Sequence, residues 1–191
     1  MEVFNVQILP AIEAAWNDVA QAQRNEYLVT QSMLAFVFCR ALRQKLPSVK
    51  ITYDGRVFTD QEANFNLLIW QDRAAPVVYF IGYLKYGLDH QPAPETLILM
   101  LKEAANKSEA PLLTHDPDSR GYEEKQIRVS SDCEFGLFFV DKLEEHMVDE
   151  KFVSNVLSTD ELTRFHLGLG PIEENGPPYT SFQYLNPSCF H

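Results

Sequence analysis

Asn66-Leu-Leu-Ile-Trp70, Gln71-Asp-Arg-Ala-Ala-Pro76 and Val77-Val-Tyr-Phe-Ile-Gly-Tyr-Leu-Lys-Tyr86 follow one another without a gap, and this stretch decides the fold that the sequence predicts. Two apolar runs rich in β-branched and aromatic residues, on either side of a short polar turn with a proline, are typical of a β-hairpin. The second run is apolar at nearly every position, which predicts a strand buried on both faces. Its one charged residue, Lys85, lies near its end, where a lysine either reaches solvent or has a specific role.

Helices are predicted on both sides of this hairpin. Apolar residues recur at three- and four-residue steps through residues 5–22, which predicts a first helix. A second helix is expected over residues 25–46, with Asn25 as its N-cap, and it is apolar enough to be covered by more than one element. A third helix is expected over residues 95–106. These helices should cover the two faces of the sheet that the hairpin begins.

Further strands are predicted before and after the hairpin. Residues 49–58 alternate between apolar and polar and include Asp54-Gly55, a tight-turn signal, so they predict a strand or a small hairpin. Residues 126–130 predict a short strand, and residues 134–141 predict a second strand buried on both faces. Residues 107–125 form the longest stretch of low hydrophobicity and predict an exposed loop, with at most a short strand at its Leu112-Leu113 pair.

The C-terminal part predicts more helix and an aromatic tail. Residues 142–157 are expected to be helical, and Ser158 to Glu161 is a capping-box pattern that should open a short helix ending at Gly168 or Gly170. The aromatic run over residues 179–184 is expected to pack across the body, because its side chains would be costly to leave in water.

Composition bounds the function classes. The chain has 191 residues, is 46% hydrophobic and 12% aromatic, and carries a net charge of −11 from 27 acidic and 16 basic residues. A single domain with a proper core is therefore expected, and tight binding to duplex nucleic acid is not, since that binding requires a basic surface. We also expect no signal peptide and no membrane span, because no apolar run approaches about 20 residues.

The three cysteines lie far apart, at positions 39, 133 and 189, with no spacing typical of a zinc site. Reduced thiols in a cytoplasmic protein are therefore expected. No Cys–His pair is selected by spacing as a nucleophile and its base, and the His115-Asp116 segment is interpreted as a solvated turn rather than a cation site. Neither metal nor any other cofactor is expected.

The predicted order of elements, helix, three strands, helix, strand, resembles that of the PD-(D/E)XK nuclease-like superfamily over residues 24–142. Ile81-Gly-Tyr-Leu-Lys85 stands where that family has an aliphatic-Glu-x-Lys strand, and Asn66-Leu-Leu-Ile69 stands where it has an aspartate followed by aliphatic residues. The resemblance implies an α/β fold in which a central mixed β-sheet is flanked by helices, the three-layer restriction-endonuclease-like architecture. It divides the chain into an N-terminal helix (1–23), this core (24–142) and C-terminal helices with the aromatic tail (143–191).

The resemblance also implies that the catalytic carboxylates are missing. Such nucleases hold Mg²⁺ with two carboxylates at neighbouring strand ends, and the metal activates water. Here Asn66 occupies the aspartate position and Tyr83 the glutamate position, so only Lys85 remains. The residues expected at a remnant binding site are Glu26, Asp54, Asn66, Tyr83, Lys85 and Tyr86. Each also has a structural interpretation: Glu26 as a helix N-terminal carboxylate, Asp54 as a turn residue, and the others as ordinary strand residues.

Three functions are consistent with these features of the sequence. The first is a non-catalytic interaction or regulatory protein on a degenerate nuclease-like scaffold, whose partner would be a protein with a basic surface complementary to the acidic chain. Its surface is expected at the end of the central strands, between Tyr83, Lys85 and Tyr86 on one side and the 107–125 segment on the other. The second is a divergent metal-dependent nuclease with its acids moved to Asp54, Asp72 or Glu95. The third is an unrelated α/β domain with a small-ligand pocket.

Overall fold

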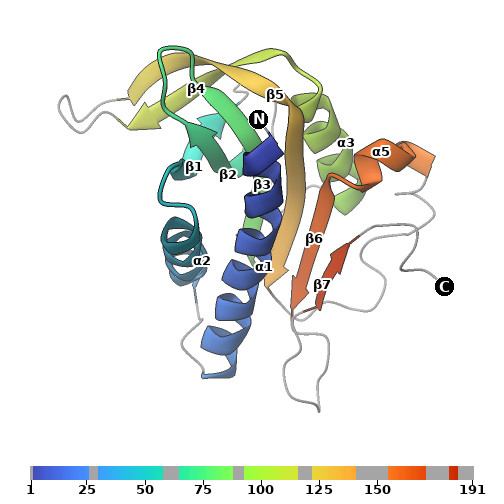
Figure 1. The fold of residues 1–191 in the computed structure, drawn as a ribbon. Coiled ribbons are helices and arrows are strands. Elements are labelled where there is room, and N and C mark those ends of the chain that lie inside the picture. Colours follow the sequence, from blue (N-terminus) through green and yellow to red (C-terminus); the bar gives the residue numbers. More distant parts are fainter. Residues whose placement is uncertain are drawn as a thin grey trace.

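The computed structural model describes residues 2–25, 30–57, 65–87, 93–115, 122–140, 155–170 and 181–184 (Figure 1). Its elements, in chain order, are α1 (Glu2–Arg24), α2 (Gln31–Lys45), β1 (Lys50–Val57), β2 (Phe65–Gln71), β3 (Val77–Tyr86), α3 (Pro94–Ala105), β4 (Glu109–His115), β5 (Tyr122–Val140), α5 (Thr159–Leu162), β6 (Phe165–Gly170) and β7 (Ser181–Tyr184). Within these ranges, no helix is at once long enough and apolar enough to cross a membrane.

The strands form one mixed sheet, which confirms the predicted α/β class. The described strands run in the order β3-β2-β1-β4-β5-β6-β7, and an additional pairing joins β3 to β5. β1, β2 and β3 are antiparallel neighbours, β3, β5 and β6 are parallel, and β7 runs antiparallel to β6. The predicted central hairpin is confirmed, with Leu67 opposite Gly82 and Gln71 opposite Val77. β3 lies between β2 and β5 and is therefore a central strand.

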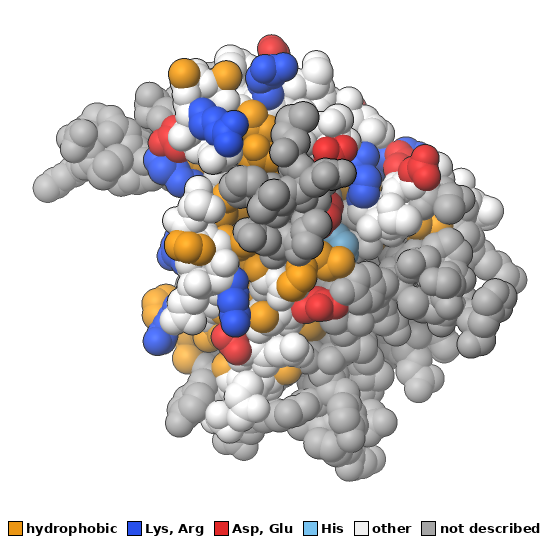
Figure 2. Space-filling model, in the orientation of Figure 1, with side chains coloured by type: hydrophobic (Ala, Val, Ile, Leu, Met, Phe, Trp, Pro, Cys, Tyr) orange, Lys and Arg blue, Asp and Glu red, His pale blue; other side chains and the backbone are white. Residues whose placement is uncertain are grey.

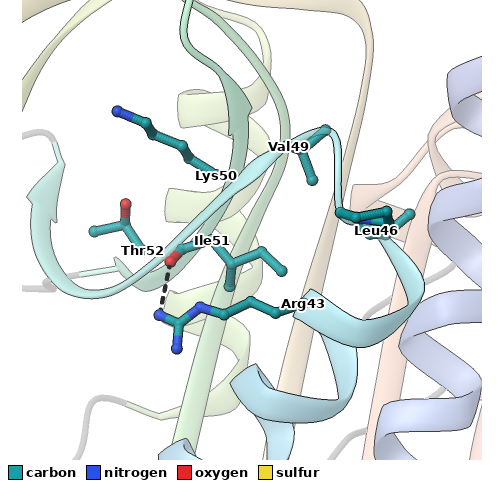
Figure 3. A pocket seen from close by; sticks show the side chains of 7 residues that line it. Arg43, Leu46, Val49, Lys50, Ile51 and Thr52 are labelled. Carbon is teal, nitrogen blue, oxygen red and sulfur yellow. Dashed lines mark hydrogen bonds between the residues drawn. The ribbon is translucent and has the colours of Figure 1, made fainter.

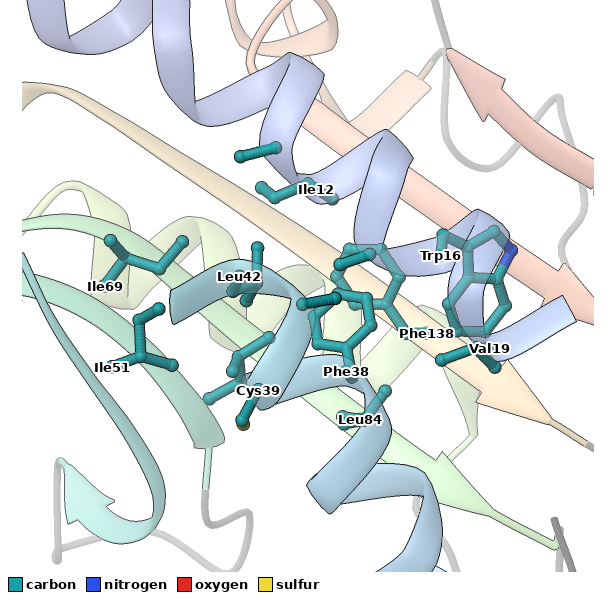
Figure 4. Packing of buried hydrophobic residues seen from close by; sticks show 14 of the residues in the cluster. Ile12, Trp16, Val19, Phe38, Cys39, Leu42, Ile51, Ile69, Leu84 and Phe138 are labelled. Atoms are coloured by element: carbon teal, nitrogen blue, oxygen red, sulfur yellow. The ribbon is translucent and has the colours of Figure 1, made fainter. Parts of the chain in front are cut away.

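One face of the sheet is covered by α1 and α2, and each of these helices contributes an aromatic ring as well as aliphatic side chains to the core on this side. Four rings meet there, those of Trp16, Phe38, Phe80 and Phe138, with centroid separations of 5.2–6.2 Å. Figure 4 shows the rings of Trp16, Phe38 and Phe138 close to one another. Gly168 of β6 lies under two of these rings: a Cβ added there would come within 2.6 Å of the Phe138 ring and 2.9 Å of Trp16. A glycine is therefore required at this position for the helix layer to approach the sheet.

The opposite face is covered by α3, which contributes aliphatic side chains to a core that also contains aromatic rings of the strands. Leu97, Ile98 and Leu101 of α3 are fully buried against sheet residues such as Leu68 and Ile81. The structure is thus a helix–sheet–helix sandwich, as predicted. Burial of the two strands predicted to be covered on both faces is also confirmed: Val78, Phe80 and Leu137 have no exposed surface, and neither do Leu67 and Ile69 of β2.

α5 is tied to α3 on this second face. The predicted capping box is present: Ser158 Oγ accepts from the Glu161 backbone N–H, and the Glu161 carboxylate accepts from the Ser158 N–H at 2.8 Å. The same carboxylate pairs with Lys102 of α3 at 3.0 Å. Burial raises the pKa of Glu161, but the hydrogen bonds from Ser158, Lys102 and Asn106 outweigh it and lower that pKa to about 2.

Several boundaries predicted from the sequence are wrong. α2 begins at Gln31, not at residue 25, because Thr30 provides its N-cap by accepting from the Met33 N–H at 3.2 Å. Asn25 instead follows the end of α1, where its N–H bonds the Gln21 carbonyl. Asp54-Gly55 does not turn the chain: β1 is one strand, and its register against β2 shifts between Tyr53 and Val57. Such an irregularity accommodates a glycine as readily as a turn does.

The largest correction concerns residues 107–125, predicted as a loop. They contain β4 and the beginning of β5, which pair from Glu109 opposite Arg128 to His115 opposite Tyr122. The two strands predicted over 126–130 and 134–141 are likewise one strand, β5. Polar residues form this hairpin because its backbone hydrogen bonds are satisfied by strand pairing, which requires no apolar side chains.

The C-terminal part differs from its prediction as well. The helix opened by the capping box ends at Leu162, and Phe165–Gly170 is strand β6 rather than the end of a helix. Of the aromatic tail, residues 181–184 form β7 and extend the sheet. Most of the helix predicted over residues 142–157 lies outside the described residues.

Candidate functional site

The C-terminal end of β3 pairs with β5 as far as Tyr86 and Val140, and on the β2 side it is held by side-chain amides. Asn66 of β2 makes two hydrogen bonds with the backbone of Leu84: its Nδ2 donates to the Leu84 carbonyl at 2.7 Å, and its Oδ1 accepts from the Leu84 N–H at 2.8 Å. Pairing between the backbones of β2 and β3 stops at Leu67 and Gly82. The Asn66 amide thus continues the ladder where the strand backbone no longer does, and it satisfies two polar groups of a half-buried peptide.

A second amide approaches the same strand end from α2. Gln31, the first residue of that helix, donates from Nε2 to the Leu84 carbonyl at 2.9 Å and to the Tyr53 hydroxyl. Its Oε1 accepts from the Tyr86 N–H at 2.5 Å. On the other side, the Gly87 N–H bonds the Val140 carbonyl of β5, and Gly87 turns the chain away with a positive φ of 81°. Residues 84–87 are therefore fixed by contacts from a helix, from β2 and from β5.

The sequence-predicted residues of this strand end divide between the two faces. Tyr83 belongs to the α3 side, where its ring lies 6.1 Å from that of Phe139, and Lys85, two residues on, projects to the same face. Tyr86 projects to the other face and packs against the α1–α2 core. All three side chains are partly buried. They do not form one flat patch, but they surround a single strand end.

This strand end does not fit the magnesium site of the nucleases that the sequence resembles. Both polar atoms of the Asn66 amide are engaged with the backbone of Leu84. Burial, with a smaller contribution from the nearby Tyr53 phenol, raises the pKa of Tyr83, so its hydroxyl stays neutral. Mg²⁺ requires hard, preferably charged oxygen ligands. Across the residues that the structure describes, no group of three metal-ligating side chains converges.

The remaining candidates are not brought to this end by the described structure. Glu26 lies outside the described residues, and only the backbone of Asp54 is described. Asp72 pairs with Lys50 beside the β2–β3 turn. That turn adjoins Val77, at the opposite end of β3, about 26 Å from Lys85 at the usual rise of a strand. Glu95 lies in the first turn of α3, which the chain enters after β3.

Cys133 and His166, whose side chains the structure describes, do not form a nucleophile–base pair. Cys133 packs into the α3-side core, and burial raises the pKa of its thiol to about 12. His166 lies on the other side of the sheet, stacked 6.3 Å from the Phe80 ring, and its Nε2 contacts Glu134 Oε2 at 3.0 Å. The histidine and glutamate are both buried. The thiol and the imidazole therefore face opposite layers, and the Glu134–His166 pair serves the packing of β5 against β6.

Sequence reasoning missed Gln31 and Tyr53 at this site. A glutamine at the start of a helix has no pattern that distinguishes it from any polar surface residue, and its role depends on α2 beginning beside the end of β3. Tyr53 was also missed, because in the sequence it is one more apolar position of the alternating strand predicted over residues 49–58. The 107–125 segment, expected as the far boundary, contains β4, which pairs with the end of β1, where Leu112 lies opposite Val57.

Comparison of the chain with models of known protein families, with curated proteins and with solved structures finds no significant match.

Proposed function

We propose that the chain is a non-catalytic interaction or regulatory protein, on a degenerate nuclease-like scaffold, that binds a protein partner at the C-terminal end of β3. The observation that carries this proposal is the Asn66 amide, which bonds the Leu84 backbone where the resembling nucleases place a metal-binding carboxylate. The site thus contributes rigidity rather than a reactive group. Rigid, partly buried tyrosines beside a lysine are typical of recognition surfaces, because they combine contact area with a polar end.

The acidic charge of −11 supports a protein partner with a complementary basic surface, whose association would be faster at low salt. The same charge weighs against duplex nucleic acid as the ligand. A cytoplasmic location is part of the proposal. It is supported by the two described cysteines, Cys39 and Cys133, which are free and buried.

The absence of metal chemistry is tested on the purified protein. Calorimetric titration with Mg²⁺ or Mn²⁺ should reveal no site tighter than millimolar, and DNA and RNA should remain intact in the presence of either ion. Asn66→Asp restores the carboxylate of the nucleases, and it should lower stability without creating a metal site, because a carboxylate cannot donate to the Leu84 carbonyl. Metal-dependent cleavage that Lys85→Ala abolishes would overturn the proposal in favour of a divergent nuclease.

The binding surface is tested by partner capture from the source lysate at low and high salt, followed by affinity measurement with the purified partner. Lys85→Ala and Tyr86→Ala should weaken binding about tenfold, the size of an ordinary hot-spot effect. Tyr79→Ala and Lys107→Ala are the matched controls, since Tyr79 lies earlier on the same strand and Lys107 follows α3. Equal affinity of the four folded variants would show that the partner does not bind at the end of β3.

A further inference from the structure

The outward face of α2 combines apolar and basic side chains in an unusual way. Phe36 is 64% exposed and Met33 is 38% exposed, and both are among the large hydrophobic residues that the described structure leaves in solvent. Arg40 follows on the same face, because residues 33, 36 and 40 are spaced by three and four. Figure 2 shows hydrophobic and Lys/Arg side chains next to one another over α2.

This face is also basic within an acidic chain. Residues 27–53 contain Arg40, Arg43, Lys45 and Lys50 and no aspartate or glutamate, whereas the chain as a whole has a net charge of −11. Basic residues in the last turn of a helix stabilise its dipole, which accounts for Arg43 and Lys45. That effect does not extend to Arg40, one turn earlier, and it gives no reason to expose Phe36.

A pocket of about 360 Å³ lies at the C-terminal end of the same helix (Figure 3). Its lining residues come from the end of α2, the following turn and the first residues of β1, and they include two cations, Arg43 and Lys50. Both cations are held in place: Arg43 Nη2 donates to the Ile51 carbonyl at 3.2 Å, and the Lys50 ammonium lies 5.2 Å from the centre of the Trp70 ring and pairs with Asp72. Arg43 connects this pocket to the exposed face of α2.

We propose that this surface, formed by Met33, Phe36, Arg40 and the pocket beside Arg43 and Lys50, binds an acidic amphipathic helix of a partner protein. Apolar residues of that helix would cover Phe36 and Met33, while its carboxylates would meet Arg40 and Arg43, since Lys50 is already paired with Asp72. Charge complementarity favours an acidic segment as the ligand, since such a segment is attracted to this face and repelled by most of the remaining surface. An extended phosphate backbone fits less well, because the exposed apolar residues interrupt the basic ones.

The test uses a synthetic amphipathic helix of about 15 residues, with leucine and phenylalanine on one face and glutamate on the other. Binding to the full-length chain is measured by fluorescence anisotropy at about 50 mM and about 300 mM salt. We expect binding that weakens with salt and is lost when every glutamate of the peptide is replaced by glutamine. Phe36→Ser and Arg40→Glu should each weaken binding about tenfold.

Matched substitutions on the other face serve as controls. Leu99 of α3 is 48% exposed and Lys107 follows that helix, so Leu99→Ser and Lys107→Glu make the same chemical changes away from α2. These controls should bind the peptide as the parent does. Unchanged melting temperatures establish that all four variants fold. Because neither Lys85 nor Tyr86 is altered, this surface and the one at the end of β3 succeed or fail separately.

Four outcomes would overturn the proposal: no binding of the acidic peptide, equal binding of its glutamine form, equal loss in the α3 controls, or preferential binding of another ligand. The last is checked with phosphatidylserine vesicles, duplex DNA and sedimentation of the chain alone. Stronger binding to vesicles or DNA that Arg40→Glu abolishes would assign the surface to phosphate groups. Self-association that Phe36→Ser abolishes would assign it to a second copy of the chain.

Discussion

The two helical layers cover the same sheet by different means. On one face, α1 and α2 approach the strands through interlocked aromatic rings and need Gly168 beneath them, while the outer surface of α2 keeps Phe36 and Arg40 in solvent. On the other face, α3 packs with aliphatic side chains, and its Lys102 is committed to Glu161 of α5. Both helices keep a large apolar side chain in solvent, Phe36 in α2 and Leu99 in α3. They differ in charge, because Lys102 of α3 is paired within the chain, whereas Arg40 of α2 is exposed.

The largest expected effect is the removal of an aromatic ring from the α1–α2 layer. Phe138→Ala should lower the free energy of unfolding by about 4 kcal/mol, because this buried ring contacts three others and its removal leaves a large cavity. Leu101→Ala in α3 should cost about 3 kcal/mol, since a smaller buried side chain is removed. Urea unfolding of both variants measures the difference, and a larger loss for Leu101→Ala would reverse the comparison.

Gln31→Ala should have the next largest effect, because this residue ties α2 to the end of β3. The change leaves the Tyr86 N–H without the acceptor that it has in the folded protein and removes a donor from the Leu84 carbonyl. A loss of about 2 kcal/mol in unfolding free energy is expected for such half-buried groups. Gln44→Ala, on an exposed position of the same helix, is the control and should be nearly neutral. Equal stability of the two variants would mean that the amide contacts are replaced by water.

The α3 layer should respond to acid through Glu161. The folded pKa of this carboxyl, about 2, lies below its unfolded value near 4.5. Its contribution is therefore fully present above pH 4.5 and is lost as the pH falls toward 2. Glu161→Gln should lower stability at neutral pH by about 1 kcal/mol, after allowance for solvent at this partly exposed pair. The difference between parent and variant, followed by urea unfolding, should shrink with acid, and a difference independent of pH would exclude this origin.

The smallest effect on stability is expected on the outer face of α2. Phe36→Ser should change the free energy of unfolding by no more than about 0.5 kcal/mol, because the ring is already largely in solvent. Thermal and urea unfolding together measure it. A loss above about 1 kcal/mol would show that Phe36 contributes to the stability of the fold, so that its exposure would need no partner to explain it.

The sequence was most informative where burial alone determines structure. The central hairpin was predicted because two apolar runs with a polar turn have few other solutions, and its buried residues followed. The β4–β5 hairpin was missed because residues 107–125 are polar, and strand pairing leaves no hydrophobic signal there. β6 was misassigned because Gly168 suggested the end of a helix, whereas the glycine makes room for the Trp16 and Phe138 rings. Such a requirement arises from residues far away in the sequence.

At the candidate site, too, some residues could be predicted from the sequence and others could not. Lys85 was predicted at the end of the buried strand, because a single charge in an apolar run is visible in the sequence. The role of Asn66 was not predicted, since only the three-dimensional structure shows that its amide bonds the Leu84 backbone. Gln31 contributes from a different element, 53 residues away from Leu84.

The Glu134–His166 contact restricts the register of β5 in the sheet. Residues 135–140 are buried on both faces, with Phe135 and Phe139 toward α3 and Phe138 toward α1. A slip of one residue would exchange the faces, yet it would bury nearly the same apolar side chains, so hydrophobicity alone specifies the register weakly. The buried carboxylate can meet the imidazole in one alignment only. Gly136 adds a second restriction, because any Cβ there would lie 3.0 Å from the His166 carbonyl. We expect these two features to select the native alignment of β5 during folding.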